Sequence, residues 1–521
     1  MFYSGNKRIV MANVSKGVMA KDTIIYMIAK GIEGIVGIVT MSVMTYLFAT
    51  DQMGYYSTVN IAITTIAMVA IQWLVQSVLR YINKYDIEGR HEEFYSTVFY
   101  SWLKVNALVI AICVVLMLVI QLGFGGFEGI FNALGVVQSE KVKGFLDVYT
   151  YRLFICGILW FVTYNTAQLM ISMLAAVREA KLNLLLSMIT VLGRLIFMVI
   201  FCKLWSSKIE WIFLSYFITD AIVSLIGMKR LKIFKYLKGR ENKEILKELK
   251  AYGMPLMGNQ LATSVLNKSD IYIITIVLSA GAAGIYQTNY SLIATAFTLL
   301  NASVMRGCYP TILRAWSEGK KDDVQRLLNE AVRMYMLVAI PAVAGVFAVS
   351  QSAANALFES QYVEGHVVMF WVALGMMFLG LTEYSIKYWE LNSNTNAIFK
   401  RSLIGGAVNV GLNLILVKLT GSYFIAAVTT FIGFFVYFIL ARYGTRNYLK
   451  WKIEPKRFIK ILGSALVMVA VIEILKTILP DSKICLAIFI ICGIIVYGAM
   501  LVITGEVKDE LAVIKNKFFK K

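Results

Sequence analysis

Long apolar segments separated by short polar connections follow one another along almost the whole chain. Each segment is about 20 residues long, which is the length an α-helix needs to cross about 30 Å of hydrocarbon. The segments are dense in Leu, Ile, Val, Met and Phe, whereas the strands of a β-barrel are short and alternate between apolar and polar residues. The pattern therefore predicts an all-α, polytopic membrane protein with about 14 transmembrane helices.

The predicted spans form two sets of six and a final pair. The first set covers 23–48, 58–81, 98–124, 148–174, 184–204 and 211–228. The second set covers 254–278, 285–309, 331–357, 367–391, 402–419 and 424–443, and the final pair covers 458–479 and 484–504. The division predicts four regions, which are an N-terminal six-helix lobe at 1–228, a basic cytoplasmic linker at 229–250, a C-terminal six-helix lobe at 251–445, and an additional helix pair with a basic tail at 446–521.

A short motif near the start of the chain recurs 230 residues later. Phe48–Ser57 (FATDQMGYYS) and Leu278–Gln287 (LSAGAAGIYQ) each join two apolar segments. This spacing is too long for a solenoid repeat and is typical of transporters with two halves, which bind their substrate at the interface between the repeats. The repeat therefore predicts two pseudo-symmetric lobes and favours transport.

The composition fits a lipid bilayer as the solvent. Hydrophobic residues make up 59% of the chain, charged residues 16%, and the mean hydropathy is +0.70. The net charge of +20 could indicate nucleic-acid binding. However, roughly 36 Lys and Arg residues lie in alternate connections and both tails, against about 6 in the opposite connections. This bias predicts cytoplasmic termini and attraction to anionic membrane lipids, with no nucleic-acid partner.

Several other signals narrow the class of protein. The six cysteines lie inside or at the ends of apolar spans without paired spacing, and the two histidines are isolated, so we expect neither disulfides nor a metal site. The first 20 residues are polar and basic, and the first apolar run lacks a small-residue cleavage pattern, so we expect no cleavable signal peptide. We find no Gly-rich phosphate loop or paired-carboxylate motif. The longest outer connection, 125–145, has only Glu128 and Glu140 as carboxylates, so we predict that the protein is not an enzyme.

Polar side chains within the apolar spans are the candidate site, because each is costly in hydrocarbon and is expected to face protein or a water-filled cavity. Lysine and arginine can hold a pyrophosphate or an acidic sugar, and amides can form hydrogen bonds with sugar hydroxyls. We predict a substrate-binding set that consists of Lys30, Asn60, Gln72, Gln76, Arg194, Asn259, Asn267, Lys268 and Lys387.

Three carboxylates, Glu33, Asp270 and Glu383, accompany these cations in the spans. They could neutralise the cations in an empty site, or bind H+ or Na+ and so couple transport to an ion gradient. We expect no other cofactor. The alternative for both sets is a structural role, in salt bridges between helices or in side chains that extend to the membrane surface.

Five motifs, in order, resemble those of bacterial oligosaccharide flippases of the multidrug/oligosaccharidyl-lipid/polysaccharide (MOP) exporter superfamily. They are Ala49–Ser57, Tyr252–Leu256, Asn267–Asp270, Ser279–Gln287 and Asn409–Leu414. The resemblance implies a V-shaped pair of six-helix lobes in a bacterial cell membrane. It also implies that an undecaprenyl-pyrophosphate-linked oligosaccharide moves from the cytoplasmic to the outer leaflet by alternating access, for surface polysaccharide biosynthesis. A polysaccharide polymerase or glycosyltransferases are further candidate partners.

Other functions remain open at this stage. A lipid II flippase is the first alternative, and a cation-coupled multidrug exporter of the same superfamily is the second. The additional helix pair favours a lipid substrate, because the drug exporters usually have twelve helices, and the pair could form an apolar groove for the polyprenyl tail. A membrane polymerase or glycosyltransferase would need a large outer loop with catalytic side chains.

Overall fold

The computed structural model describes residues 16–124, 140–177, 179–480 and 482–508, and every regular element within these ranges is helical. The all-α prediction is therefore confirmed. The helices of the first half are α1 (Lys16–Leu47), α2 (Thr50–Ile87), α3 (His91–Phe124), α5 (Glu140–Ala176), α6 (Ala180–Leu204) and α7 (Ile209–Arg230), followed by the 3-10 helix η1 (Ile233–Lys238). Those of the second half are α8 (Lys243–Val277), α9 (Ala280–Ser317), α10 (Lys321–Leu357), α11 (Ser360–Val363), α12 (His366–Ser385), α13 (Lys387–Leu391), α14 (Thr395–Thr420) and α15 (Phe424–Thr445), with α16 (Pro455–Ile478) and α17 (Lys483–Thr504) after them.

Each predicted span coincides with one of these helices, except that the span at 367–391 divides between α12 and α13. Among the described residues, eleven helices are long and apolar enough to cross a membrane, and the apolar part of α1 at Gly31–Leu47 is shorter. α8 and α9 are not among the eleven. With eleven such helices in its described part, the protein is a multi-pass membrane protein.

The chain divides into two compact units. The first consists of 1–37, 70–206 and 210–254, and the second of 38–69, 207–209 and 255–521. The helices α1, α2 and α8 therefore contribute residues to both units. The four regions predicted from the sequence remain a prediction.

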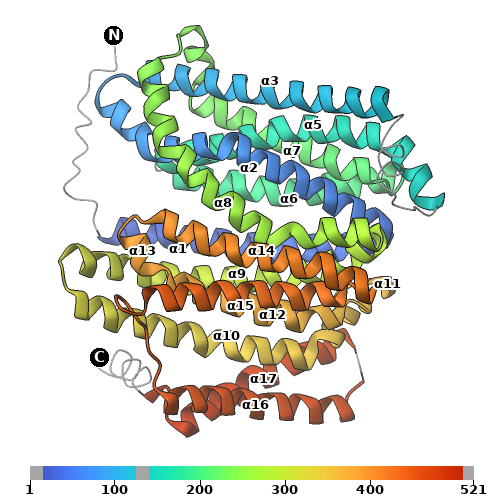
Figure 1. Ribbon diagram of the computed structural model, residues 1–521, viewed down its shortest axis with the longest axis vertical. Helices are drawn as coiled ribbons and strands as arrows, with labels where there is room; N and C mark the ends of the chain where they lie inside the picture. The colour runs from blue at the N-terminus through green and yellow to red at the C-terminus, as the bar shows by residue number, and fades with distance from the viewer. Residues whose placement is uncertain (1–15, 125–139, 178, 481, 509–521) are drawn as a thin grey trace. The chain divides into compact units, whose positions relative to one another are not determined.

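In the second unit, close helix packing depends on small residues. α12 and α14 both pack along α15, and α10 packs against α9 and α12 (Figure 1). At the α14–α15 crossing, a methyl group on Gly405 would approach the Gly433 carbonyl oxygen to 2.9 Å. Small residues let helix backbones approach in a membrane, where apolar burial alone does not hold helices together.

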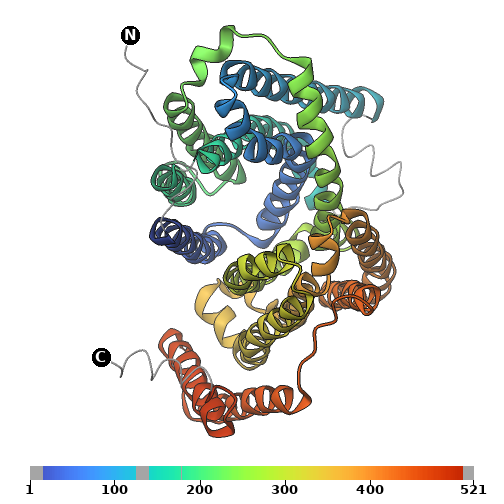
Figure 2. The ribbon, with the colours of Figure 1, turned by 90° about the vertical axis from the view of Figure 1, so that its left-hand side faces the viewer.

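The additional pair, α16 and α17, packs against α10 and lies together in both views (Figures 1 and 2). Ala348 of α10, Met468 and Ile472 of α16 and Phe489 of α17 share one apolar cluster. A buried ion pair joins the same elements beyond the end of α17, where Arg333 Nε lies 2.9 Å from Glu506 Oε1. The pair is therefore attached to the second unit through both apolar and ionic contacts.

The first unit has the same kind of packing. α5 contacts α6, and η1 contacts α3. Leu174 of α5, Leu186 of α6 and Val223 of α7 form a fully buried cluster. A methyl group on Gly193 of α6 would lie 2.9 Å from the Thr219 side chain of α7, so these helices also meet at a glycine.

Candidate functional site

The most deeply buried carboxylate among the predicted residues is Asp270 of α8, which is 1% exposed. Its Oδ1 accepts hydrogen bonds from Asn409 Nδ2 at 3.1 Å and Asn413 Nδ2 at 2.6 Å, both on α14. Its Oδ2 accepts from Tyr286 of α9 at 2.8 Å and from Thr430 of α15. Four helices of the second unit therefore meet at this carboxylate.

The Asp270 cluster, which we define as Asp270, Tyr286, Asn409, Asn413 and Thr430, is rich in oxygen atoms. Asn409 Oδ1 accepts from Asn413 Nδ2 at 3.0 Å, and Thr430 Oγ1 also lies 2.8 Å from the Ala426 carbonyl oxygen. Asn413 Oδ1 is buried without a hydrogen-bond partner among the described residues. Carboxylate, amide, hydroxyl and backbone oxygens are the donors that hard cations prefer.

Asp270 is among the residues predicted from the sequence, and Asn409 and Asn413 lie in the motif Asn409–Leu414, but the sequence does not predict that they contact Asp270. Asn409 and Asn413 stand one helical turn apart in an apolar span, and this spacing is the signal that could have marked them as one polar face. Among the described residues, no group of three or more His, Cys, Asp and Glu side chains could hold a metal ion. The cluster instead combines one carboxylate with neutral oxygen donors.

Lys268 lies two residues before Asp270 on the same helix and is half-buried. Its Nζ is 3.5 Å from Thr64 Oγ1 of α2, which is a weak contact at the limit for a hydrogen bond. Further along the same pair of helices, the hydroxyls of Thr58 and Thr275 lie 3.1 Å apart. α2 and α8 thus bring polar side chains together within the second unit.

Lys387, at the start of α13, is 2% exposed and forms a 2.6 Å ion pair with Glu390. Its Nζ also lies 4.8 Å from the centre of the Tyr309 ring. Glu383 lies one turn earlier on α12 and is half-buried. These three charges, at spacings of four and three residues, lie in the second unit next to the interruption between α12 and α13.

Arg194 of α6 belongs to the first unit and has a buried acidic partner. Its terminal nitrogen lies 2.6 Å from Oδ2 of Asp220 on α7, a carboxylate with no exposed surface. Trp160 Nε1 donates to the same oxygen at 3.0 Å, and the guanidinium lies 4.6 Å from the centre of the Tyr216 ring. Because breaking a buried ion pair is costly, this contact gives Arg194 a structural role. A direct contact with substrate remains a prediction.

For the remaining predicted residues, the structure describes some side chains and not others. Glu33 on α1, and Asn60, Gln72 and Gln76 on α2, are half-buried. The side chains of Lys30, Asn259 and Asn267 lie outside the described part of the structure, although their backbones are helical. The assignment of all these side chains to one substrate site stays a prediction.

A polar contact outside the apolar stretches joins the end of α2 to the start of α8. Lys84 Nζ lies 2.7 Å from Glu248 Oε1, and the Tyr85 hydroxyl donates to the other carboxylate oxygen. Partial burial alone would raise the pKa of Glu248, but the hydrogen bonds from Lys84 and Tyr85 hold this pKa below its ordinary value. Glu248 therefore remains ionised around neutral pH and stabilises this end of the first unit.

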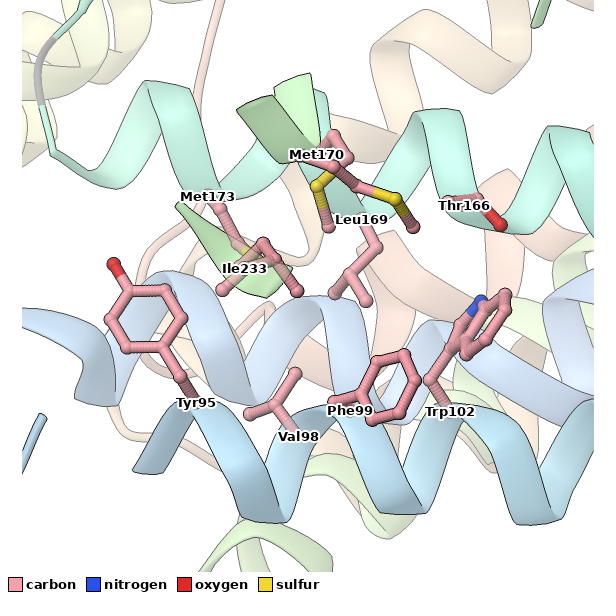
Figure 3. Close-up of a pocket in the computed structure, with 10 residues that line it drawn as sticks. Tyr95, Val98, Phe99, Trp102, Thr166, Leu169, Met170, Met173 and Ile233 are labelled. Carbon is pink, nitrogen blue, oxygen red and sulfur yellow. The ribbon is translucent and has the colours of Figure 1, made fainter. Parts of the chain in front are cut away.

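A pocket in the first unit is apolar (Figure 3). Phe99 and Trp102 of α3, Met170 and Met173 of α5 and Ile233 of η1 are among the residues that line it. It is lined by no charged side chain, so it does not provide the chemistry that recognises a pyrophosphate.

Solved structures of low sequence identity share this fold. The lipid II flippase MurJ, in its inward closed conformation, is 16% identical with a TM-score of 0.67, and the match covers 94% of this chain and 100% of that chain. A multidrug resistance MATE family transporter of the MOP superfamily, in its inward-facing conformation, is 13% identical with a TM-score of 0.59, covering 82% of this chain and 94% of that chain. The described helices and these likenesses define a multi-pass membrane protein with the MOP-superfamily fold, as the sequence motifs implied.

Within this class, the chain belongs to the polysaccharide biosynthesis protein family, whose pattern matches residues 19–316. It is also similar to the probable low-salt glycan biosynthesis flippase Agl15 of Haloferax volcanii, with 23% identity over 242 residues. This match covers 46% of the chain and 51% of Agl15, so it spans about half the length of that relative.

Proposed function

We propose that this protein is a flippase that moves a polyprenyl-pyrophosphate-linked oligosaccharide from the cytoplasmic to the outer leaflet of the cell membrane by alternating access. The observation that carries the proposal is membership of the polysaccharide biosynthesis protein family in a chain with the MOP-superfamily fold. The similarity to a relative named as a glycan biosynthesis flippase supports it. The function is transport, and no catalytic residue is assigned.

The additional helix pair favours a lipid-linked substrate over a drug. The MurJ likeness covers 94% of this chain, whereas the MATE likeness covers 82%. The pair α16 and α17 is attached to α10 through a buried apolar cluster, and exposed apolar side chains such as Leu466 and Ile494 would contact the polyprenyl tail while the headgroup crosses. The likeness to MurJ keeps lipid II as the alternative substrate.

The Asp270 cluster supports ion coupling, with H+ or Na+ as the coupling ion. A buried carboxylate is costly in a membrane, so a bound proton or cation would stabilise it. Asp270 offers two oxygens, and the amide oxygens of Asn409 and Asn413 and the Thr430 hydroxyl complete an oxygen-rich group at the junction of four helices. Ion binding there would favour one arrangement of these helices over another. Glu33 and Glu383 remain further candidates for this role.

For the glycan itself, we assign Lys268 and Lys387 as the described cations that would contact the pyrophosphate or an acidic sugar, together with Lys30. Amides at Asn60, Gln72, Gln76, Asn259 and Asn267 would form hydrogen bonds with sugar hydroxyls. The Lys/Arg distribution supports cytoplasmic termini for this arrangement.

The test is removal of the gene from its native cell. We expect loss of surface polysaccharide and accumulation of the lipid-linked oligosaccharide on the cytoplasmic leaflet, with restoration by the wild-type chain. Accumulation of lipid II in place of the oligosaccharide would transfer the assignment to the alternative substrate. Normal levels of both lipids and normal surface polysaccharide would reject the flippase assignment.

A further inference from the structure

Helix ends from the two halves of the sequence cap one another in the second unit. The last carbonyl groups of an α-helix have no partner within the helix and need one from elsewhere. At the end of α10, the Leu357 carbonyl accepts from Ser42 and the Phe358 carbonyl accepts from the Tyr46 hydroxyl at 3.4 Å, both on α1. The end of α10 therefore depends on α1 for its capping groups.

Tyr362, in the short helix α11, provides the reciprocal contact. Its hydroxyl donates to the Phe48 carbonyl, just beyond the end of α1, at 2.7 Å. The Tyr362 carbonyl in turn accepts from Asn289 Nδ2 of α9 at 2.9 Å, and the residue has no exposed surface. Tyr362 thus joins the turn between α1 and α2 to α9.

The two copies of the repeated sequence motif meet beside this contact. A methyl group on Gly54 of α2 would overlap the Ala280 carbonyl, and one on Gly284 of α9 would overlap the Thr50 carbonyl. The first turns of α2 and α9 therefore cross backbone against backbone, which only glycine permits at this separation. The two copies of the repeated sequence motif therefore pack directly against each other.

This arrangement can open at low cost. The hydroxyls of Ser42, Tyr46 and Tyr362 donate to carbonyls at helix ends, and the Glu359 backbone N–H donates to the Thr45 hydroxyl at 3.3 Å. Water can replace either partner of these bonds once the helices separate. The glycines contribute no interlocking side chains, so the two helix starts can part without rotamer changes. These are the properties of a contact that forms and breaks during a transport cycle.

We propose that residues 42–58, 278–289 and 357–365 form a closure, which is a contact that opens and closes reversibly. We further propose that Tyr362 is its latch, the residue whose hydrogen bond holds the contact closed. The hydroxyl of Tyr362 favours the closed state, and loss of its bond to the Phe48 carbonyl removes one of the contacts that hold this state and so raises the open fraction. With the termini in the cytoplasm, this closure lies at the outer side of the membrane. The inference rests on the proposed alternating access and names the residue that sets the balance between its states.

The experiment measures opening directly, in the purified full-length protein in lipid nanodiscs. A Thr45→Cys substitution places a thiol at a position that is 1% exposed and where the native hydroxyl accepts from the Glu359 backbone N–H at 3.3 Å across the closure. A maleimide can label this thiol only when the closure opens, so the labelling rate follows the open fraction. Peptide mass spectrometry measures position 45 separately from the six native cysteines.

Tyr362→Phe removes only the hydroxyl, and we expect the labelling rate to rise roughly 2- to 10-fold. The matched control is Tyr497→Phe, because the Tyr497 hydroxyl also donates to a carbonyl, that of Leu337, at 2.8 Å, but between α17 and α10. We expect this control to label at the wild-type rate. Ser42→Ala removes another bond of the closure and gives the same expected increase if Tyr362→Phe does not fold.

An unchanged rate in the Tyr362→Phe protein would overturn the latch, as would an equal increase in the Tyr497→Phe control. The labelling does not require substrate or transport. A protein that moves no lipid-linked glycan but shows the expected labelling would therefore reject the proposed function and keep the closure.

Discussion

Replacement of Asp270 separates its structural contribution from its proposed role in coupling. In Asp270→Ala, four donors lose their acceptor, but two of them have another within reach. Thr430 can donate to the Ala426 carbonyl at 2.8 Å, and Asn413 already donates to Asn409 Oδ1 at 3.0 Å. Asn409 also has a further interaction, whereas the Tyr286 hydroxyl is left unsatisfied. At about 1–3 kcal/mol for a buried unsatisfied group, we expect a loss of about 1–3 kcal/mol.

Asp270→Asn has nearly the same shape and keeps an oxygen for the two asparagine amides. The Tyr286 and Thr430 hydroxyls can rotate to accept from the new amide. We therefore expect this variant to unfold at a temperature closer to wild type than Asp270→Ala does, in thermal unfolding of the purified protein. Because the amide carries no charge and takes up no proton, we also expect the variant to lose gradient dependence.

The assay for coupling is glycan flipping in proteoliposomes with and without an imposed H+ or Na+ gradient. For wild type, one of the two gradients should increase the rate, and for Asp270→Asn neither should. Equal stimulation of both proteins would refute coupling at Asp270. A lower melting temperature for Asp270→Asn than for Asp270→Ala would refute the hydrogen-bond argument.

Three further predictions concern ion pairs. Arg194→Ala leaves Asp220 buried without its cation and should cost about 3–5 kcal/mol in thermal unfolding, whereas a wild-type melting temperature with lost transport would indicate a substrate contact instead. Glu506→Gln should weaken the attachment of α16 and α17 through Arg333, which would appear as faster amide hydrogen exchange in those two helices than in α14, and unchanged exchange would contradict it. The ionised Glu248 carboxylate stabilises the folded state by up to about 1 kcal/mol. Its pKa is lower in the folded state, so this stabilisation is lost as the pH falls below 4.5, the ordinary pKa of a glutamate. Glu248→Gln should therefore show a smaller fall in melting temperature on acidification than wild type, and equal falls would count against the contact.

The positions of the helices follow from the sequence because hydrocarbon permits few alternatives. A segment in lipid must satisfy its backbone groups internally, so a long apolar run has to be helical. Residues three apart on a helix lie on the same face, so Lys387 and Glu390 could be expected to pair. In the structure, Lys387 Nζ lies 2.6 Å from Glu390 Oε2.

The partners of buried groups depend on helix rotation and on which helices are neighbours, and the sequence specifies neither directly. Asp270 meets Asn413, which is 143 residues away, and Arg194 meets Asp220 on the next helix. Likewise, the motif at Phe48–Ser57 and its copy at Leu278–Gln287 could be recognised as a repeat. The sequence does not show that Gly54 packs against the start of α9 and Gly284 against the start of α2.

Movement of a lipid-linked glycan across a bilayer can be measured with the purified protein in liposomes. A fluorescent polyprenyl-pyrophosphate oligosaccharide is placed in both leaflets, and a glycan-modifying enzyme that cannot enter is added outside. We expect nearly all of the labelled lipid to become accessible when the protein is present, against about half in protein-free liposomes. Accessibility of only the outer half with folded protein present would contradict this expectation.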